Sequence, residues 1–366
     1  MSKKSILFVM HELVAGGAER VVVNLANNLD RDKFEVHICL FNKKGWLLDL
    51  LKDDVTIHDL KTPRVSRGAI KFPFLLLSLK PDFVFSSIDH VNLLISVQIK
   101  VLKLFLRNTK FIAREVNIPS IRAKYEQLGK QDYFYSKTIN QYDYLIAQSN
   151  YMKDDIVKSY NIEASKITVV PNPLDITHIK RSIQNIDEEE LYSSGKINLL
   201  AIGYLRPQKG FDLLLKTVPL LDDFLHLNIL GDGAEKENLE KQIKQLGIED
   251  KVTMLGVDEN PYKFMKQSDM VVLSSLYEGF PNVILEANAC GKFVVAFECP
   301  GVSSEIIEDS INGVLVDPEN IKALADAINS YVKIKHDEKK ISKTTDRYKV
   351  ENVVKVYERL LLGNDI

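Results

Sequence analysis

The sequence predicts an α/β protein built from two doubly wound parallel-sheet domains that follow one another along the chain. The length of 366 residues suggests two domains, since a domain usually takes about 100–200 residues. Short apolar runs alternate with amphipathic stretches throughout, the pattern of a parallel sheet covered by helices on both faces. A polar, acid-rich segment at 178–196 interrupts this pattern and has the composition of a linker.

Seven apolar runs precede the linker and are expected to be the strands of the first sheet. They are residues 5–10, 35–41, 55–60, 82–87, 110–115, 144–149 and 167–172. Segment 18–30 carries its apolar residues on one face and is expected to be a helix. Six further runs follow the linker, at residues 196–203, 225–233, 252–256, 270–275, 293–298 and 313–317. Because open parallel sheets bind ligands outside the carboxyl ends of their strands, both domains are expected to offer their loops to one cleft.

The net charge of the chain is −2, but it is divided unevenly along the sequence. Residues 1–180 hold 26 basic and 19 acidic side chains, a net charge of +7, and the remaining residues carry −9. The first half therefore has room for an anionic partner. A hydrophobic content of 45% and a charged content of 27% exclude collagen-like, disordered and disulfide-scaffold classes.

Cysteine usage and the N-terminus predict a cytoplasmic location. Cys39, Cys290 and Cys299 are odd in number and lack a CxxC pair, which argues against a disulfide framework or a zinc site. The apolar run at 5–10 is too short for a signal peptide and is better explained as a buried first strand. No stretch approaches the roughly 18 apolar residues of a membrane span.

Two glycines, Gly16 and Gly17, follow the first expected strand in the turn VAGGAER (14–20). They allow the backbone to turn tightly, and a helix beginning near Ala18 directs its N–H groups and its positive dipole end to the same place. A phosphate is the expected ligand. The alternative is an ordinary strand-to-helix turn, in which glycines are common.

The loop GYLRPQKG (203–210) follows the first strand of the second domain and places two cations near Gly203. Arg206 and Lys209 can clamp a diphosphate, the arginine as a planar fork and the lysine as a point charge. The alternative is a solvated surface loop.

The segment EGFPNVILEA (278–287) combines two carboxylates with the start of a helix. Glu278 precedes the turn Gly279-Phe280-Pro281, and a helix beginning near Asn282 supplies free N–H groups. Glu286 stands in an apolar stretch and needs a polar partner, for which ribose hydroxyls are suitable. The alternatives are an exposed turn acid for Glu278 and a surface position for Glu286.

Four motifs in this order resemble the retaining glycosyltransferases of family 4, which have the GT-B fold. They are GGAER (16–20), GYLRPQKG (203–210), EGFPNVILEA (278–287) and PGVSSEII (300–307). The resemblance covers nearly the whole chain and includes VVPNPLD (169–175). It implies an acceptor-side domain at 1–178, a linker at 179–196, a sugar-nucleotide domain at 197–344 and a C-terminal helix at 345–366 that returns to the first domain.

The resemblance also implies roles for individual residues. Arg206 and Lys209 match the pair that neutralises the donor diphosphate and stabilises the leaving group. Glu286 matches the carboxylate that binds the ribose, and Glu278 matches the one that contacts the donor sugar.

The remaining donor contacts implied by the resemblance come mainly from the backbone. The donor-binding stretch is Gly279, Phe280, Pro281, Asn282 and Val283, in which the backbone N–H groups from Phe280 to Val283 help Glu278 to bind the sugar hydroxyls. The backbone near Leu255 holds the base. Gly17 closes over the phosphates, and Gly16 and Gly203 lie in the adjoining loops. Because two cations and helix ends neutralise the diphosphate, no metal and no other cofactor are expected.

One position departs from the family pattern. Many members carry a histidine after the strand that here reads KFIARE, whereas this chain has Glu115, followed by Asn117 and Pro119 as in one subset of the family. Glu115 is expected to face the donor sugar or the acceptor hydroxyl as a proton acceptor. The alternative is a salt bridge to Arg114 or a lysine. His11 and His90 also end first-domain strands and are candidates to line the cleft; the alternative is a structural role, which is more common for a lone histidine at a strand end.

The resemblance implies transfer of a hexose or N-acetylhexosamine from a UDP-sugar to a lipid-linked glycan acceptor, with retention of configuration. The alternatives are a GDP-mannose-dependent mannosyltransferase, a GT-B protein that binds a sugar nucleotide without turnover, and a GT-B epimerase. Nucleic acid is not needed to explain the basic first half.

Two basic and apolar stretches, at 61–74 and 96–110, suggest peripheral binding to an anionic membrane at its cytoplasmic face. The alternative for the second stretch is a helix that covers the sheet and exposes only a basic edge.

Overall fold

We describe a computed structural model of the chain over residues 3–14, 16–125, 129–184, 191–192, 195–301 and 305–363. The chain divides into two compact units. The first comprises Met1–Pro173 together with Val350–Ile366, and the second is Leu174–Lys349. The sequence placed the corresponding boundaries after residues 178 and 344.

The described part of the first unit contains a seven-stranded parallel sheet with the order β3-β2-β1-β4-β5-β6-β7. The strands are β1 (Lys4–Met10), β2 (Phe34–Leu40), β3 (Thr56–Asp59), β4 (Phe83–Ser86), β5 (Lys110–Arg114), β6 (Tyr144–Ala147) and β7 (Ile167–Val169). Each lies within or next to one of the apolar runs, which confirms the predicted sheet. β7 ends earlier than expected because Pro171 and Pro173 have no N–H group for the ladder.

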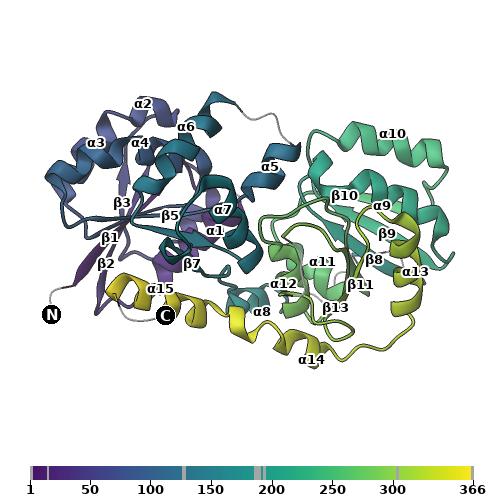
Figure 1. The fold of residues 1–366 in the computed structure, drawn as a ribbon. Helices are drawn as coiled ribbons and strands as arrows, with labels where there is room; N and C mark the ends of the chain where they lie inside the picture. Colours follow the sequence, from purple (N-terminus) through teal and green to yellow (C-terminus); the bar gives the residue numbers. More distant parts are fainter. Residues whose placement is uncertain are drawn as a thin grey trace. The chain divides into compact units, whose positions relative to one another are not determined.

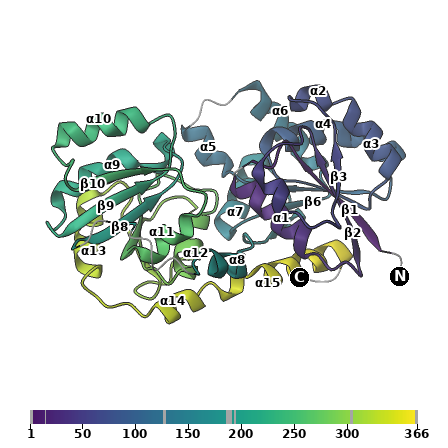
Figure 2. The same cartoon turned by 180° about the vertical axis from the view of Figure 1, so that it is seen from behind.

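Helices cover both faces of this sheet (Figure 1, Figure 2). They are α1 (Gly17–Asn28), α2 (Val65–Gly68), α3 (Lys71–Leu79), α4 (Asp89–Phe105), α5 (Pro119–Tyr125), α6 (Lys130–Thr138), α7 (Asn150–Tyr160) and α15 (Val350–Leu362), with short 3-10 turns at Trp46–Leu50, Ile139–Gln141 and Ala164–Lys166. β1 shows why two cores form: Ile6, Phe8 and Met10 pack with α1 and α15, while Leu7 and Val9 pack with α3, α4 and α7.

The C-terminal helix belongs to the first unit although it follows the second in sequence. A 3-10 turn, η6 (Asp346–Tyr348), precedes α15, whose Val353, Val354 and Tyr357 join the core around α1. In the second unit, the Leu174 N–H donates to the Tyr348 carbonyl over 2.7 Å. The chain passes between the units twice, next to Leu174 and next to Tyr348, and this hydrogen bond holds the two residues side by side.

The described part of the second unit contains a six-stranded parallel sheet with the order β10-β9-β8-β11-β12-β13. The strands are β8 (Ile197–Ile202), β9 (Leu225–Leu230), β10 (Val252–Gly256), β11 (Met270–Leu273), β12 (Val294–Phe297) and β13 (Gly313–Val316). Its helices are α8 (Ile176–Ser182), α9 (Phe211–Thr217), α10 (Lys236–Leu246), α11 (Pro261–Gln267), α12 (Asn282–Ala289), α13 (Ile321–Tyr331) and α14 (Glu338–Lys343), with 3-10 turns at Pro207–Lys209 and Val218–Leu220. α9, α10 and α13 contribute to the core on one face, and α8, α11 and α12 to the core on the other.

The segment expected to be a linker begins inside α8. The Asp175 carboxylate caps this helix by accepting from the His178 N–H over 2.8 Å, and Ile179 is buried in the second unit. Residues 185–190 and 193–194 of that segment lie outside the described residues.

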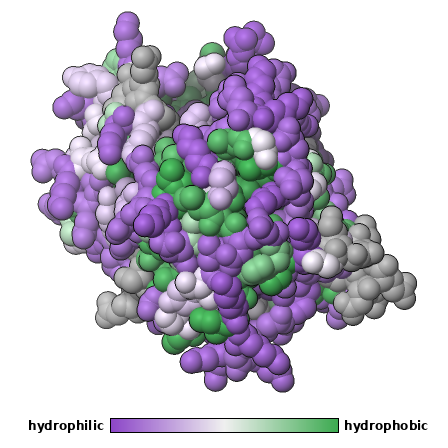
Figure 3. Space-filling view, turned by 90° about the vertical axis from the view of Figure 1, so that its right-hand side faces the viewer, coloured by the Kyte–Doolittle hydropathy of each residue, from purple (hydrophilic) through white to green (hydrophobic). Residues whose placement is uncertain are grey.

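Hydrophilic residues cover most of the surface in Figure 3, and an apolar area interrupts them near its centre. Among the residues that the structure describes, no helix combines the length and the apolar composition needed to span a membrane.

Candidate active site

The two most informative loops of the second unit come from adjacent strands. β8 leads into residues 203–210 and β11 into residues 274–281, so both loops start at the same edge of the sheet. Three hydrogen bonds join them. The Gln208 side chain donates to the Tyr277 carbonyl (3.0 Å), the Leu276 N–H donates to the Gln208 carbonyl (2.8 Å), and the Ser274 hydroxyl donates to the Lys209 carbonyl (2.9 Å).

A glycine is required where these loops touch. Gly210 has φ +60°, and a Cβ atom there would lie 2.2 Å from the Ser274 carbonyl oxygen. Any other side chain would separate the loops. Gly203 is different, because a Cβ there would only touch the aliphatic stem of Lys209 at 3.5 Å, an ordinary packing contact.

Lys209 and Glu278 form an ion pair within this joint. Lys209 Nζ lies 2.6 Å from Glu278 Oε1, and the Ser275 hydroxyl donates to the same oxygen over 2.6 Å. Glu278 is only 7% exposed, so it is not the exposed turn acid of the alternative interpretation. The sequence did not predict the ion pair between Lys209 and Glu278. Its one local signal was for the Ser275 hydrogen bond, because Ser275 stands three residues before Glu278 in the same loop.

Arg206 differs from Lys209 in its surroundings. Its side chain is exposed, and its guanidinium carbon lies 4.5 Å from the centre of the Tyr204 ring. The two cations therefore share one loop, but only Lys209 is bound to Glu278. Arg206 has no ion pair with any described residue, so it can turn toward an anionic ligand without breaking one.

The turn Gly279-Phe280-Pro281 leads into α12, whose N-terminal N–H groups face the end of the loop. The Asn282 N–H donates to the Phe280 carbonyl (3.0 Å), and Val283 is partly buried against the core. Glu286, one turn further, is half-buried, and its Oε1 accepts from the Tyr262 hydroxyl over 3.4 Å. Glu286 therefore has the polar partner that its apolar surroundings require, supplied by α11.

Leu255 lies in an irregular part of β10. The register between β10 and β9 shifts between Met254 and Gly256, so Leu255 occupies a β-bulge, and Gly256 has φ +76°. Bulges are common beside binding sites because they redirect the backbone. The neighbouring Gly231 N–H donates to the Gly256 carbonyl over 2.7 Å, which fixes the end of this strand beside the loop after β9.

α1 begins at Gly17 with Gly16 as its N-cap, one residue before the start near Ala18 that the sequence predicted. A Cβ atom on Gly16 would lie 2.0 Å from Glu19 Oε2, so the Glu19 carboxylate packs over this backbone. Burial raises the pKa of the Glu19 carboxyl, and a hydrogen bond to its own backbone N–H opposes that rise. A phosphate bound at this helix end would have to displace Glu19.

Glu115 is buried at the carboxyl end of β5, with 3% of its surface exposed. Its Oε1 accepts from the Tyr135 hydroxyl and, over 3.5 Å, from the Asn92 side-chain amide. Burial, followed by the nearby Asp89 carboxylate, raises the pKa of Glu115 to about 8. The carboxyl group is therefore mainly protonated at neutral pH.

The expected alternative, a salt bridge between Glu115 and Arg114, is not among the contacts of the described residues. The Arg114 guanidinium is buried and donates instead to the Ser87 hydroxyl (2.9 Å) and to the Asn172 side-chain oxygen. Neighbouring residues of a strand point to opposite faces, which separates the two side chains. Tyr135, the partner of Glu115, comes from α6 and has no sequence signal that connects it with β5.

Within the described ranges, no group of three or more His, Cys, Asp or Glu side chains is arranged to hold a metal ion. That the reaction needs no metal ion stays a prediction.

Two family models match the chain. Residues 15–178 match Glycosyltransferase Family 4, and residues 182–348 match Glycosyl transferases group 1. The N-acetylgalactosamine-N,N'-diacetylbacillosaminyl-diphospho-undecaprenol 4-alpha-N-acetylgalactosaminyltransferase of Campylobacter jejuni subsp. jejuni serotype O:2 is 27% identical over 97% of this chain and 96% of its own length. The lipopolysaccharide 1,6-galactosyltransferase of Escherichia coli K12 is 26% identical over 60% of each chain.

Solved structures show the same architecture. HepE of Anabaena, in complex with UDP and glucose, superposes with a TM-score of 0.81 at 22% identity, covering 98% of this chain and 100% of HepE. Sucrose-phosphate synthase of Thermosynechococcus elongatus also reaches 0.81, at 15% identity, covering 99% and 100%. These likenesses, with the two parallel sheets, define a GT-B protein. The matches along the sequence then place the chain within that class: it belongs to the family 4 glycosyltransferases.

Proposed function

We propose that the protein transfers a hexose or N-acetylhexosamine from a UDP-sugar to a lipid-linked glycan, with retention of configuration, in surface-polysaccharide or glycan assembly. The observation that carries the proposal is the joint between the loops at 203–210 and 274–281, where Lys209 pairs with the buried Glu278 close to the N-terminus of α12 and Arg206 stands exposed in the same loop. The Campylobacter relative is named for transfer to an undecaprenol-linked sugar, which supports the acceptor class, and the UDP in HepE supports the base.

In this proposal the second unit binds the donor. Arg206 and Lys209 hold the diphosphate and stabilise the charge that develops on it as the glycosidic bond breaks. Glu278 accepts hydrogen bonds from hydroxyls of the donor sugar, while Glu286 binds the ribose and the backbone at Leu255 holds the base. The N-terminal N–H groups of α12 add positive potential at the phosphates. Because Lys209 is bound to Glu278, the two halves of the donor site adjust together when a diphosphate arrives.

The proton of the acceptor hydroxyl passes, in this proposal, to the donor phosphate. Glu115 is a poor proton acceptor at neutral pH because its raised pKa keeps it mainly protonated. Its bond to Tyr135 makes it a positioning residue for α6 instead.

We also propose that the enzyme works at the inner face of the cytoplasmic membrane. α4 exposes an apolar stripe that includes Val97, Val101, Leu104 and Phe105. Contiguous exposed apolar side chains mark interaction surfaces, and Lys100 lies exposed among them.

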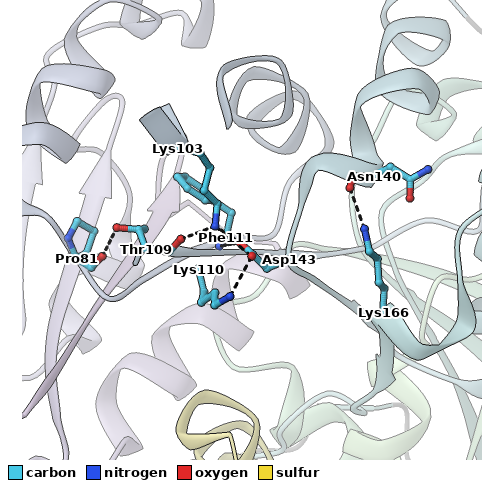
Figure 4. A network of polar contacts seen from close by, with 8 residues as sticks. All are labelled: Pro81, Lys103, Thr109, Lys110, Phe111, Asn140, Asp143 and Lys166. Atoms are coloured by element: carbon cyan, nitrogen blue, oxygen red, sulfur yellow. Dashed lines mark hydrogen bonds and ion pairs between the residues drawn. The ribbon is translucent and has the colours of Figure 1, made fainter. Parts of the chain in front are cut away.

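The basic residues at the end of this segment are less available than the sequence suggested (Figure 4). Lys103 Nζ lies 2.9 Å and Lys110 Nζ 3.4 Å from the Asp143 carboxylate, which also accepts from the Phe111 N–H over 2.8 Å. These lysines fix the end of α4 to β5. The membrane proposal therefore rests on the apolar stripe more than on these charges.

The test is a two-stage measurement on the full chain. Thermal shift with UDP and with GDP identifies the base, because a ligand that binds only the folded state raises its apparent stability. Release of UDP from UDP-sugars is then measured with and without a lipid-linked acceptor. Stronger stabilisation by GDP would favour the mannosyltransferase, and binding without acceptor-dependent release would favour a non-catalytic protein.

A further inference from the structure

An apolar pocket of about 560 Å³ opens on the first unit, between α2, α4 and α6. Its walls are mainly the apolar side chains of Pro63, Val65, Leu93, Leu94, Val97 and Phe134. The volume falls in the range of roughly 300–1,000 Å³ that is usual for ligand pockets. Val97 and Phe134 are about half exposed, at 49% and 56%, so the pocket opens to the surface between them.

A polar pocket of about 340 Å³ adjoins it at the carboxyl ends of β4 and β5. Arg122 Nη1 lies 2.9 Å from the Asp89 carboxylate and 3.0 Å from that of Asp132, and the Asn117 side-chain amide donates to Asp89 over 2.8 Å. Asp89 Oδ1 is buried and has no hydrogen-bond partner among the described residues. The side chains of Asn117, Gln131 and Asp132 line this pocket and can exchange hydrogen bonds with a hydroxyl-rich ligand.

The two pockets share His90, Leu93 and Gln131 as lining residues. His11, which follows β1, packs against His90 with ring centroids 5.4 Å apart. Arg64 also lines the apolar pocket beside His11. His90 lines both pockets, whereas Arg64 lines the apolar one. The Arg64 guanidinium and the His90 imidazole can donate hydrogen bonds to an anion there, while His11 Nε2 already donates to the Pro63 carbonyl over 3.1 Å.

We propose that these pockets bind the lipid-linked acceptor as one amphipathic ligand. The isoprenoid segment next to the head group occupies the apolar pocket, its phosphates lie beside His90 and Arg64, and its sugar enters the polar pocket beside Asp89. This inference rests on the proposed function and deepens it. The proposed ligand is a hydrocarbon chain that carries phosphate and sugar. The apolar pocket, the cation beside it and the polar pocket follow one another in the same order as the hydrocarbon, phosphate and sugar of that ligand.

The test measures direct binding of farnesyl diphosphate, a short isoprenoid diphosphate, to the full chain by calorimetry without any donor. Two substitutions place a charge in the apolar wall from opposite sides: Val97→Glu on α4 and Phe134→Glu on α6. Each has a matched control on the same helix that does not line the pocket, Val101→Glu and Tyr133→Glu, whose native side chains are 61% and 64% exposed.

We expect each wall variant to weaken farnesyl diphosphate binding by about tenfold or more, and each control to change it by less than about twofold. Inorganic pyrophosphate should bind more weakly than farnesyl diphosphate and equally to all variants. Equal losses in wall and control variants would overturn the assignment, as would equal binding of the two ligands to the wild type.

UDP binding, measured by thermal shift on the same variants, separates this inference from the proposed function. Retained UDP binding with no discrimination between wall and control variants would contradict the acceptor pocket alone. Specific farnesyl diphosphate binding without transfer from any UDP-sugar would leave the pocket standing and contradict the proposed activity.

Discussion

Lys209 and Glu278 are bound to each other across two loops, with 2.6 Å between Nζ and Oε1, although we assign them to different parts of the donor. The ammonium group neutralises the diphosphate and the carboxylate binds the sugar. Their pairing couples the two binding events, because a diphosphate that attracts Lys209 also loosens its hold on Glu278.

Substitution of Glu278 should separate binding from turnover. In Glu278→Gln the ammonium of Lys209 no longer has a carboxylate partner, so we expect UDP to bind at least as tightly as to the wild type. Turnover of the UDP-sugar should fall by about tenfold or more, because the sugar loses its charged acceptor. Calorimetry with UDP and steady-state UDP release measure the two effects. Parallel losses of both would contradict the assignment.

Lys209→Ala should also destabilise the fold, because it leaves the Glu278 carboxylate buried and unpaired. Removal of one partner of a buried pair costs about 3–5 kcal/mol, and since Lys209 is partly exposed we expect the lower end of that range or less. Lys216→Ala is the matched control, since Lys216 forms an exposed pair with Asp212. Urea unfolding compares the free energies of unfolding of the two variants. Equal losses would show that the buried pair adds no more stability than the exposed one.

Arg206→Ala should impair chemistry without affecting stability. Its side chain is exposed, so the free energy of unfolding should change by less than about 0.5 kcal/mol. Loss of a cation that stabilises the leaving diphosphate should lower turnover by about 100–1,000-fold. Lys241→Ala, an exposed cation on α10, is the control, and unchanged turnover in Arg206→Ala would remove this residue from the mechanism.

Gly210→Ala tests the joint between the loops. Gly210 and Gly247 have nearly the same φ, +60° and +63°, but only Gly210 has a backbone oxygen where the new Cβ would lie. Both substitutions incur about 1–2 kcal/mol for the left-handed conformation. Gly210→Ala should cost more than Gly247→Ala and should also lower UDP affinity. Equal costs in urea unfolding would mean that the loops can separate freely.

Glu115 should make stability depend on pH. A carboxyl group whose pKa rises from 4.5 to about 8 on folding keeps its proton in the folded state while the unfolded chain loses it. The free energy of unfolding therefore falls as the pH rises from about 4.5 to about 8. Glu115→Gln should flatten this dependence and retain most turnover at neutral pH. A large loss of turnover, with the pH dependence of stability intact, would restore Glu115 as a proton acceptor.

Chelation should leave the reaction unchanged. Arg206, Lys209 and the N-terminus of α12 are expected to neutralise the diphosphate, so UDP release should be the same with and without EDTA. Loss of turnover that added Mg²⁺ restores would show that the protein side chains are not sufficient.

The sequence predicted the strands and the loops well, because a buried parallel strand needs a continuous apolar run. β8 and β11 were found in this way, and their loops contain Arg206, Lys209 and Glu278. The pairings between distant segments were not predictable. Tyr135 binds Glu115, and Asp143 binds Lys103 and Lys110, through contacts that no local periodicity encodes. Because Lys103 and Lys110 pair with Asp143, segment 96–110 exposes less positive charge than the sequence suggested.

The position of α15 has a consequence for synthesis. The ribosome makes the whole of Leu174–Lys349 before it reaches Val350, so the second unit can fold while the first still lacks Val353, Val354 and Tyr357. The first unit can therefore complete the core around β1 only when translation ends. A premature stop near residue 350 would therefore harm the part of the protein that was made earliest, and leave the later part whole.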